Sequence, residues 1–312
     1  MELNSKIYVA GHRGLVGSAI LRALQSKGYH NLVLRTSSEL DLRNREEVDR
    51  LFEQEKIDYV FLAAAKVGGI AANNDYPADF IRDNLLIQTN VIDAAYRYNV
   101  EKLLFLGSTC IYPKFAPQPL KEEYLLSGEL EPTNQPYAIA KIAGINMCQS
   151  YNRQYGTKYI SVMPTNMYGP HDNFDLKTSH VLPALIRKFH DAKENKIPTV
   201  EVWGTGSPKR EFLHSDDLAE ACLFLMNHYN DSEIINVGVG NDISIKELAE
   251  LIKSIVGYQG EIVFNSSIPD GTPRKLVDVT KINNLGWEAK ISLEDGLRSV
   301  YQSFKNEYLI EQ

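Results

Sequence analysis

Tyr137 and Lys141 stand four residues apart, in the run Tyr-Ala-Ile-Ala-Lys, and their spacing suits proton transfer. On a helix both side chains face the same way, one turn apart. A free phenol titrates near about pH 10, and a neighbouring ammonium favours the phenolate and lowers that pKa. Such a pair can protonate the oxygen of a carbonyl group that is being reduced. The alternative is a surface tyrosine packed on a lysine stem, because this spacing is common in helices.

A serine and a cysteine follow an apolar strand that we predict over residues 102–107. Ligands bind at the carboxyl ends of strands in α/β sheets, so Ser108 would hydrogen-bond a substrate oxygen beside Tyr137. We expect Cys110 on the same side of an extended strand, where its thiolate could act as a base. His180 would be the partner acid, because imidazole titrates near neutral pH. From these residues alone, a turn serine, a core cysteine and a helix-start histidine remain open alternatives.

A glycine-rich turn is the candidate cofactor site. The pattern Gly11-x-x-Gly14-x-x-Gly17 lies between a strand predicted at residues 6–10 and a helix that reaches about residue 27. Glycines at these positions permit a tight turn, close approach of a pyrophosphate and close packing of the helix on the strand. Amide groups at the helix start then face the phosphates. A tight turn without a ligand is the alternative.

The end of the second predicted strand, residues 31–35, indicates which dinucleotide is bound. An acidic residue there would accept from the ribose 2′-hydroxyl of NAD, whereas Arg35 suits a 2′-phosphate. Arg13, inside the glycine-rich turn, could add a second cation. We therefore favour NADP(H). Glu39 and Asp41 keep NAD open, and Asp41 with Leu42 could instead flank the adenine.

Short apolar strands alternate with helices through the first half of the chain. Beyond the strands already given, we expect strands at residues 59–65, 158–163 and 234–237, and helices at residues 45–54, 77–99 and 137–155. A polar, proline-rich loop covers residues 112–135. Apolar strands without alternation are typical of a parallel sheet covered by helices on both faces. The sequence thus predicts an α/β fold with a Rossmann-type doubly wound sheet.

The alternation of strands and helices becomes irregular after Pro164. Helices are expected at residues 180–193, 216–229, 245–256 and 293–308, with a short strand at residues 200–203. We interpret residues 166–312 as a smaller α/β lobe that binds substrate. Residues 1–165, together with about 214–238, would form the NADP-binding domain, so the two domains interleave.

Composition limits the class of protein. A chain of 312 residues suits one large domain or two unequal ones. A net charge of −7 argues against binding to nucleic acid or a membrane surface. The three cysteines lack CxxC spacing and fit a reducing compartment, and the seven histidines show no metal-ligand spacing. With neither a secretory-signal pattern nor a membrane-length apolar run, we expect a cytoplasmic protein that needs no metal.

Blocks spread over nearly the whole chain carry a family resemblance. They are residues 10–17 (AGHRGLVG), 63–70 (AAAKVGGI), 107–113 (GSTCIYP), 136–144 (PYAIAKIAG), 164–173 (PTNMYGPHDN) and 269–275 (PDGTPRK). With Ser108, Tyr137 and Lys141 behind the glycine-rich turn, they resemble the GDP-L-fucose synthases, a family of extended short-chain dehydrogenases/reductases.

The resemblance implies two activities in one pocket. GDP-4-keto-6-deoxy-D-mannose is epimerised at sugar carbons 3 and 5, and its 4-keto group is then reduced by NADPH to give GDP-L-fucose. Cys110 would act as the base and His180 as the acid on the opposite face of the inverted carbon. Ser108 and Tyr137 would bond the enolate oxygen, as an oxyanion hole does. Tyr137 would then donate its proton during reduction, and Lys141 would bridge to the nicotinamide ribose.

Further contacts and an assembly also follow from the resemblance. The cofactor would contact Gly11, His12, Arg13, Gly14, Leu15, Val16, Gly17, Leu106, Gly107, Ser108, Thr109, Pro164, Thr165, Asn166, Met167 and His180, besides the residues at its ribose ends. The GDP-sugar would contact Lys188, Trp203, Arg210 and Asp270, whose types suit a diphosphate, a stacking surface and a ribose or base. Without the resemblance, these four would be ordinary surface charges or a core aromatic. The helices that begin near residues 77 and 137 would pair with copies of themselves in a homodimer.

Two rival functions remain open. A reductase or 4-epimerase acting on another nucleotide sugar would need neither Cys110 nor His180. A cofactor-sensing or scaffold protein could keep the fold without turnover, but it would have no reason to keep Ser108, Tyr137 and Lys141 together.

Overall fold

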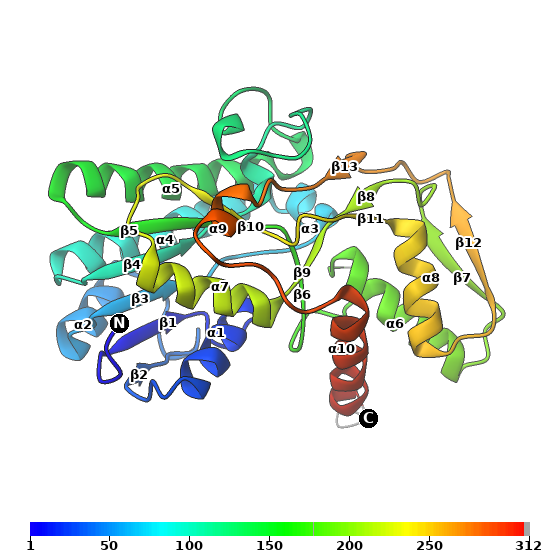
Figure 1. Cartoon of the computed structure of the whole chain (residues 1–312), viewed down its shortest axis with the longest axis horizontal. Coiled ribbons are helices and arrows are strands. Elements are labelled where there is room, and N and C mark those ends of the chain that lie inside the picture. Colours follow the sequence, from blue (N-terminus) through cyan, green and yellow to red (C-terminus); the bar gives the residue numbers. More distant parts are fainter. Residues whose placement is uncertain (177, 309–312) are drawn as a thin grey trace.

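The structure of the protein is a computed structural model that describes residues 1–176 and 178–308, apart from the side chains of residues 70, 71, 307 and 308. Its centre is a six-stranded sheet in the order β10-β5-β4-β3-β1-β2 (Figure 1). Every pairing in this sheet is parallel. The strands are β1 (Ile7–Ala10), β2 (Leu32–Val33), β3 (Tyr59–Leu62), β4 (Lys102–Leu106), β5 (Tyr159–Pro164) and β10 (Ile235–Val237). The strand order reverses between β1 and β3, which is where such sheets bind nucleotides.

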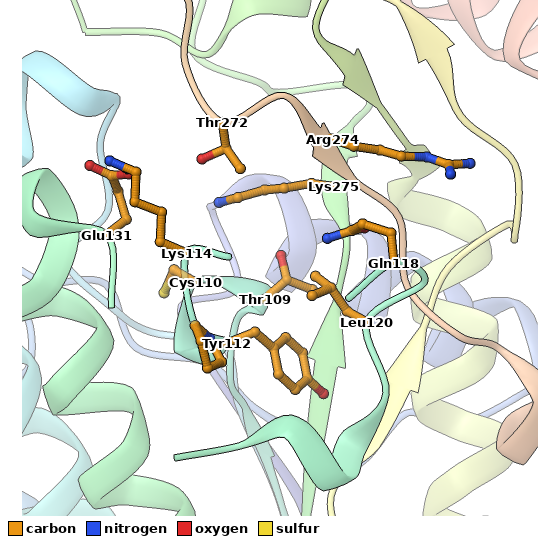
Figure 2. Close-up of a pocket in the computed structure, with 11 residues that line it drawn as sticks. Thr109, Cys110, Tyr112, Lys114, Gln118, Leu120, Glu131, Thr272, Arg274 and Lys275 are labelled. Carbon is orange, nitrogen blue, oxygen red and sulfur yellow. The ribbon is translucent and has the colours of Figure 1, made fainter. Parts of the chain in front are cut away.

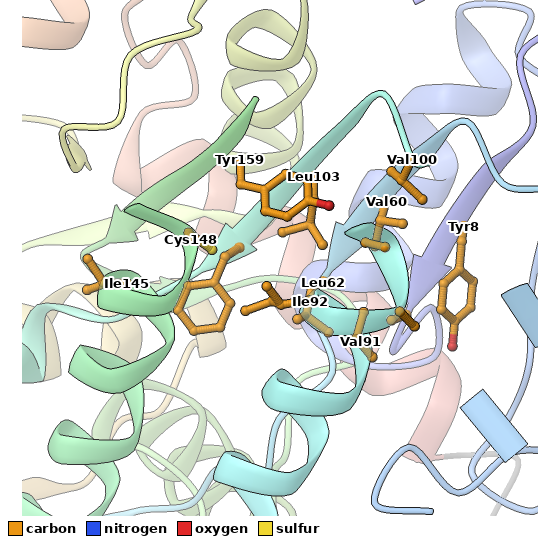
Figure 3. Packing of buried hydrophobic residues seen from close by; sticks show 14 of the residues in the cluster. Tyr8, Val60, Leu62, Val91, Ile92, Val100, Leu103, Ile145, Cys148 and Tyr159 are labelled. Atoms are coloured by element: carbon orange, nitrogen blue, oxygen red, sulfur yellow. The ribbon is translucent and has the colours of Figure 1, made fainter. Parts of the chain in front are cut away.

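Helices cover both faces of the sheet, and strand residues alternate between two apolar cores. One face carries α2 (Arg45–Glu55), α4 (Pro77–Arg97) and α5 (Gln135–Tyr155). Their side chains pack on Tyr8, Leu62 and Leu103 (Figure 3). The other face carries α1 (Leu15–Ser26) and α7 (Ser215–His228), packed on Ile7, Phe61 and Leu104. The predicted doubly wound α/β fold is therefore confirmed.

Local deviations from the predicted elements have simple causes. The second strand is only two residues long, Leu32–Val33, because it lies at the sheet edge and pairs with β1 alone. A six-residue helix, α3 (Ile70–Asp75), was not expected, since a helix this short shows no apolar period. The loop expected at residues 112–135 contains two single 3₁₀ turns, η2 (Glu122–Tyr124) and η3 (Pro132–Asn134).

A second group of elements forms around a third apolar core. Helices α6 (Val181–Glu194), α8 (Ile245–Val256) and α10 (Leu293–Tyr308) pack there with the parallel pair β7 (Thr199–Trp203) and β12 (Glu261–Asn265). The sequence did not predict β12 or the very short pieces, which are too brief for periodicity. These pieces are β6 (Asn166–Tyr168), β8 (Lys209–Arg210), β9 (Phe212–His214), β11 (Ile243–Ser244), β13 (Arg274–Lys275) and α9 (Thr280–Asn284).

Two elements from the second half of the chain lie with the first. β10 pairs with β5 in the main sheet, and α7 packs against α1. The chain therefore leaves the main sheet after β5 and returns to it with α7 and β10, as Figure 1 shows. The division into a domain of residues 1–165 with about 214–238 and a lobe of residues 166–312 stays a prediction.

Lys102, at the start of β4, is buried and closes the carboxyl end of α7. Its Nζ donates to the backbone carbonyl oxygens of Met226 and Tyr229 at 2.7 and 2.6 Å, and to that of Leu225 at 3.1 Å. It also donates to Oδ1 of Asn230 at 3.0 Å. The last carbonyls of a helix lack partners within the helix, and a cation there is favourable. Lys102 thus ties α7 to the sheet.

We expect Lys102→Met to lower the free energy of unfolding by about 2–4 kcal/mol, because it leaves buried carbonyl oxygens without a donor while filling a similar volume. Denaturant titration measures the loss. Lys158→Met is the matched control, since Lys158 is an exposed lysine whose removal changes the charge equally. Equal effects from the two substitutions would contradict the role given to Lys102.

Candidate active site

Helix α5 positions Tyr137 and Lys141 beside the end of β4. The helix begins at Gln135, with Pro136 in its first turn, where a missing N–H costs nothing. Nζ of Lys141 donates to the carbonyl oxygen of Leu106 at 2.8 Å. It also lies 4.8 Å from the ring centroid of Phe105 and 5.8 Å from that of Tyr137. The buried ammonium therefore sits between the strand end and the phenol ring.

Ser108 and Cys110 form a turn, not an extended strand. β4 ends at Leu106, and Thr109–Ile111 is a single 3₁₀ turn. Ser108 caps this turn, and its Oγ accepts from the backbone N of Cys110 at 3.3 Å. The expectation that Cys110 continues a strand is wrong, because the capping serine ends the strand. The turn still places the Ser108 side chain near the Cys110 thiol and the Tyr137 phenol, where it opposes the rise in the pKa of each.

Burial controls the titration of these groups. It raises the pKa of Tyr137, and the nearby Cys110 raises it further, while the Ser108 hydrogen bond acts in the opposite direction. The lowering that we expected from Lys141 is therefore wrong for this structure. Burial also lowers the pKa of Lys141 to about 8 and raises the pKa of Cys110 above its ordinary value. Burial thus shifts the pKa of each of the three groups in the direction of its uncharged form, although Lys141 remains an ammonium below about pH 8.

Lys275 belongs to the site, and we did not predict it. It lines a pocket together with Cys110, Lys114 and Glu131 (Figure 2). Lys114 and Glu131 form an ion pair of 2.9 Å in this pocket. Burial raises the pKa of the Cys110 thiol, and the charge of Lys275 opposes that rise without reversing it. Lys275 lies in residues 269–275, one of the blocks that carry the family resemblance. Within this block, the resemblance implied a ligand contact for Asp270 alone.

His180 occupies the position before the first residue of α6. The residue is exposed to solvent. The surrounding protein and the charge of Lys275 both lower its pKa. Lys275 therefore acts electrostatically on both Cys110 and His180, the two residues to which we gave proton-transfer roles.

The glycine-rich turn has the geometry of a phosphate site. Gly11 has φ +85, and a Cβ there would lie 2.8 Å from the backbone N of Ala64. A Cβ on Gly17 would lie 2.1 Å from the carbonyl oxygen of Gly11. Both positions therefore require glycine. Gly14 is the N-cap of the 12-residue helix α1, so free amide groups at this helix start face the turn. The residues present fit a dinucleotide pyrophosphate.

The ribose end of the expected cofactor site is occupied by ion pairs. Arg35 pairs with Glu55 at 2.6 Å, and Arg43 holds Asp41 at 2.9 Å. The charge of Arg35 also acts on Glu39. A 2′-phosphate would therefore have to compete with Glu55 for Arg35, and the roles of Arg35, Asp41 and Leu42 stay predictions.

The segments expected beside the nicotinamide lie next to each other. β4 and β5 are neighbours, with Leu106 opposite Val162, so residues 106–109 and 164–167 leave the same edge of the sheet. Two bonds fix the second segment. The backbone N of Thr165 donates to the carbonyl oxygen of Val237 at 3.0 Å, and Nδ2 of Asn166 donates to that of Glu211 at 2.8 Å.

The residues expected at the GDP-sugar form two pairs. Nζ of Lys188 lies 4.9 Å from the ring centroid of Trp203, which is 59% exposed. The charge of Asp270 acts on Arg210. Asp270 also accepts from the backbone N of Thr205 at 2.9 Å, two residues beyond Trp203, so the pairs share one region. An exposed aromatic ring with two cations suits a nucleoside diphosphate.

The part of the chain that the structure describes contains no group of three or more His, Cys, Asp or Glu side chains that could hold a metal ion. Nor does any helix within the described ranges have the length and apolar character needed to cross a membrane.

Comparison with known proteins gives a consistent result. The profile of the NAD dependent epimerase/dehydratase family matches residues 7–238. GDP-L-fucose synthase 1 of Arabidopsis thaliana is 61% identical over 96% of this chain and 93% of its own length. GDP-L-fucose synthase of Escherichia coli K12 is 58% identical over 96% of both chains. The crystal structure of a GDP-L-fucose synthetase from Naegleria fowleri bound to NADP has a TM-score of 0.93 and 31% identity, covering 99% of this chain and 95% of that one. The chain therefore belongs to the NAD dependent epimerase/dehydratase family and, within it, to the GDP-L-fucose synthases.

Proposed function

We propose that this protein converts GDP-4-keto-6-deoxy-D-mannose to GDP-L-fucose, by epimerisation at sugar carbons 3 and 5 and NADPH-dependent reduction of the 4-keto group. One observation carries the proposal. The Cys110 thiol and the Tyr137 phenol both lie near the Ser108 hydroxyl, and Lys275 lines the same pocket as Cys110. Two hydroxyl donors and a thiol base around one point suit both an enolate and an alkoxide.

We assign the residues of the site to successive proton transfers. A hydrogen next to a ketone is acidic because the enolate spreads charge onto the oxygen, and Ser108 with Tyr137 would bond that oxygen. Inversion needs removal of the proton on one face and delivery on the other, which we give to Cys110 and His180. In the reduction, Tyr137 protonates the same oxygen.

The cofactor residues follow from the same geometry. The turn from Gly11 to Gly17 would hold the pyrophosphate, and Arg13 with Arg35 the 2′-phosphate. Lys141, one helical turn after Tyr137 on α5, would reach the nicotinamide ribose. When bound, NADPH supplies the hydride for carbon 4.

NADPH oxidation with GDP-4-keto-6-deoxy-D-mannose, with the product sugar identified by NMR, tests the proposal. We expect NADPH consumption with GDP-L-fucose formed. Consumption with only the unepimerised D-sugar formed would keep the reductase and remove the roles of Cys110 and His180. Absence of consumption by a protein that binds NADPH would favour another nucleotide sugar or a cofactor-sensing function.

We expect the two half-reactions to differ at alkaline pH. The Lys141 ammonium is present below its pKa of about 8 and is lost above it, so the reduction rate should fall by up to about tenfold for each further pH unit. Epimerisation should persist there, because its rate should be level between the pKa of His180, which is lowered, and the pKa of Cys110, which is raised. Between these two values, the loss of protonated His180 with rising pH is balanced by the gain of Cys110 thiolate. NADPH oxidation and deuterium incorporation from D₂O, followed from about pH 6 to about pH 10, separate the two. A parallel fall in both rates above about pH 8 would contradict this assignment.

We also propose a homodimer formed through α4 and α5. These helices pack on each other, and their outer sides carry Leu86 and Ile139, which are 40% and 42% exposed. We expect Leu86→Glu to convert dimer to monomer in light scattering, because a buried unpaired charge opposes association. Leu3→Glu is the control, since Leu3 is 61% exposed at the other end of the sheet order, near β2. A parent chain that is monomeric at micromolar concentration would overturn the proposal.

A cytoplasmic location is part of the proposal. Cys110, Cys148 and Cys222 are free and buried, which suits a reducing compartment. Neither nucleic acid nor membrane is a proposed partner, given the acidic balance of the chain. Fractionation of the source cells, with the protein detected by antibody, would test the location, and recovery with secreted material would reject it.

A further inference from the structure

Glu211 is a fully buried carboxylate between β8 and β9. Its Oε1 accepts from the backbone N of Val239 at 2.6 Å and of Gly240 at 2.7 Å. Its Oε2 accepts from the backbone N of Val277 at 3.0 Å, and the Thr165 side chain lies near enough to lower the pKa of the carboxylate. Burial raises the pKa of Glu211, and these bonds oppose the rise. A carboxylate is tolerated at such depth only when donors replace its lost water.

The backbone of Glu211 makes two more bonds. Its N donates to the carbonyl oxygen of Lys275 at 3.3 Å, and its carbonyl oxygen accepts from Nδ2 of Asn166 at 2.8 Å. One residue therefore joins the segment after β5, the loop after β10 and the strand β13. These segments lie far apart in the sequence but meet around this side chain.

The joined segments carry proposed ligand and acid–base residues. Arg210 directly precedes Glu211 and pairs with Lys275 in the parallel β8–β13 ladder. Lys275 reaches the pocket of Cys110 (Figure 2). Residues 164–167 form the segment expected beside the nicotinamide. We infer that Glu211 is a positioning residue, which holds Arg210 and Lys275 against the cofactor segment. The inference rests on the proposed function.

The fit around the carboxylate leaves little freedom. A Cβ added to Gly238 would lie 2.4 Å from Oε1 and 2.5 Å from Cγ2 of Val277. The loop after β10 therefore approaches Glu211 as closely as a glycine allows. A shift of the carboxylate would move β13, and Lys275 with it.

Glu211→Gln breaks this arrangement at a defined place. A glutamine offers one acceptor oxygen, which should face the two donors of Val239 and Gly240. Its NH₂ group would then meet the N–H of Val277, and two donors cannot bond each other. The side-chain bond to Val277, just after β13, is lost, whereas the bonds to the loop after β10 and the backbone bond between residue 211 and Lys275 remain.

Asp217→Asn is the matched control. Asp217 is buried, and its Oδ2 accepts from the backbone N of Lys290 at 3.1 Å and of Ile291 at 2.8 Å. It too ties distant segments together through backbone donors, but it carries no proposed role in the site. Asp217→Asn should lower the thermal midpoint less than Glu211→Gln, because the amide oxygen of asparagine can still accept from both Lys290 and Ile291, so the variants are compared at a temperature well below both midpoints.

The experiment compares the parent, Glu211→Gln and Asp217→Asn proteins. The measurements are the Kd for GDP, the Kd for NADPH and the rate of deuterium incorporation at carbons 3 and 5 of the keto sugar in D₂O. We expect Glu211→Gln to weaken GDP binding about tenfold and to slow incorporation about ten- to hundredfold, with the NADPH Kd within about twofold. Asp217→Asn should stay within about twofold on all three.

Equal GDP affinity and incorporation in the two variants, measured well below both thermal midpoints, would overturn the inference and leave Glu211 a residue of the fold alone. If Glu211→Gln does not fold, Glu211→Asp takes its place with the same expected contrast to Asp217→Asn. A parent that binds GDP but does not exchange deuterium would overturn the proposed function, while the GDP affinities still decide the role of Glu211. A parent that binds no GDP would overturn both.

Discussion

Tyr137→Phe is expected to slow the reduction about 10²–10⁴-fold while the protein keeps its fold. The substitution removes the one hydroxyl that we assign to protonating the oxygen on carbon 4. The Ser108 hydroxyl, which lies within reach of the Tyr137 phenol, should still bond the enolate oxygen. Epimerisation should therefore fall much less than reduction. Single-turnover NADPH oxidation and deuterium incorporation from D₂O measure the two rates separately.

Tyr151→Phe is the control for this substitution. Tyr151 lies on the same helix, and its hydroxyl donates to Oδ1 of Asp93 at 2.8 Å. The Tyr151→Phe protein loses the same hydroxyl group nearly four helical turns away from Tyr137. Its rate of reduction should therefore match that of the parent protein. Reduction by Tyr137→Phe at the parent rate would remove the proton-donor role from Tyr137 and would turn attention to Ser108.

The main sheet could be predicted from sequence because its strands and helices have strong patterns. Buried apolar strands between amphipathic helices admit few other arrangements. The glycine-rich turn could be placed for the same reason, since Gly11 and Gly17 are demanded by backbone contacts close in sequence and space. At this turn, the spacing of glycines in the sequence and the close backbone contacts in the fold both point to the same structure.

The acid–base centre was only partly predictable, because its geometry comes from contacts between distant segments. Ser108 ends a strand by capping the next turn, a choice that competes with continuing the strand. Lys275 reaches Cys110 only because a two-residue strand, β13, pairs with β8. A strand of two residues is too short to show the alternation of apolar and polar residues by which a strand is predicted from sequence. Glu211 was missed for the same reason, since its partners lie in loops after β10 and β13.

The direction of the Tyr137 pKa shows why charge arguments need the structure. From spacing alone, Lys141 should lower that pKa. In the fold, the Lys141 ammonium donates to the carbonyl oxygen of Leu106, and burial is the larger influence on the phenol. A proton donor with a raised pKa stays protonated at neutral pH, which suits a group that must give up its proton only as negative charge develops on the substrate.

Cys110→Ser is expected to abolish epimerisation and to keep reduction, so that the product is the unepimerised D-sugar. A serine hydroxyl is almost never ionised at neutral pH, whereas a thiol is far more acidic, and the charge of Lys275 opposes the rise that burial causes in the pKa of Cys110. We expect deuterium incorporation at carbons 3 and 5 to fall about 10²–10⁴-fold. Reduction should stay within a few-fold of the parent rate, because Ser108, Tyr137 and Lys141 are unchanged and the new side chain is nearly the same size.

Cys148→Ser is the matched control, since Cys148 is a buried thiol on α5 that lies in the apolar core. It should keep both activities. NMR of the product sugar reads the outcome directly, because GDP-L-fucose and the D-sugar differ in configuration at both carbons. GDP-L-fucose formed by Cys110→Ser at the parent rate would mean that another group removes the protons. Lys275 would then be the first candidate, because burial lowers its pKa and it lines the same pocket.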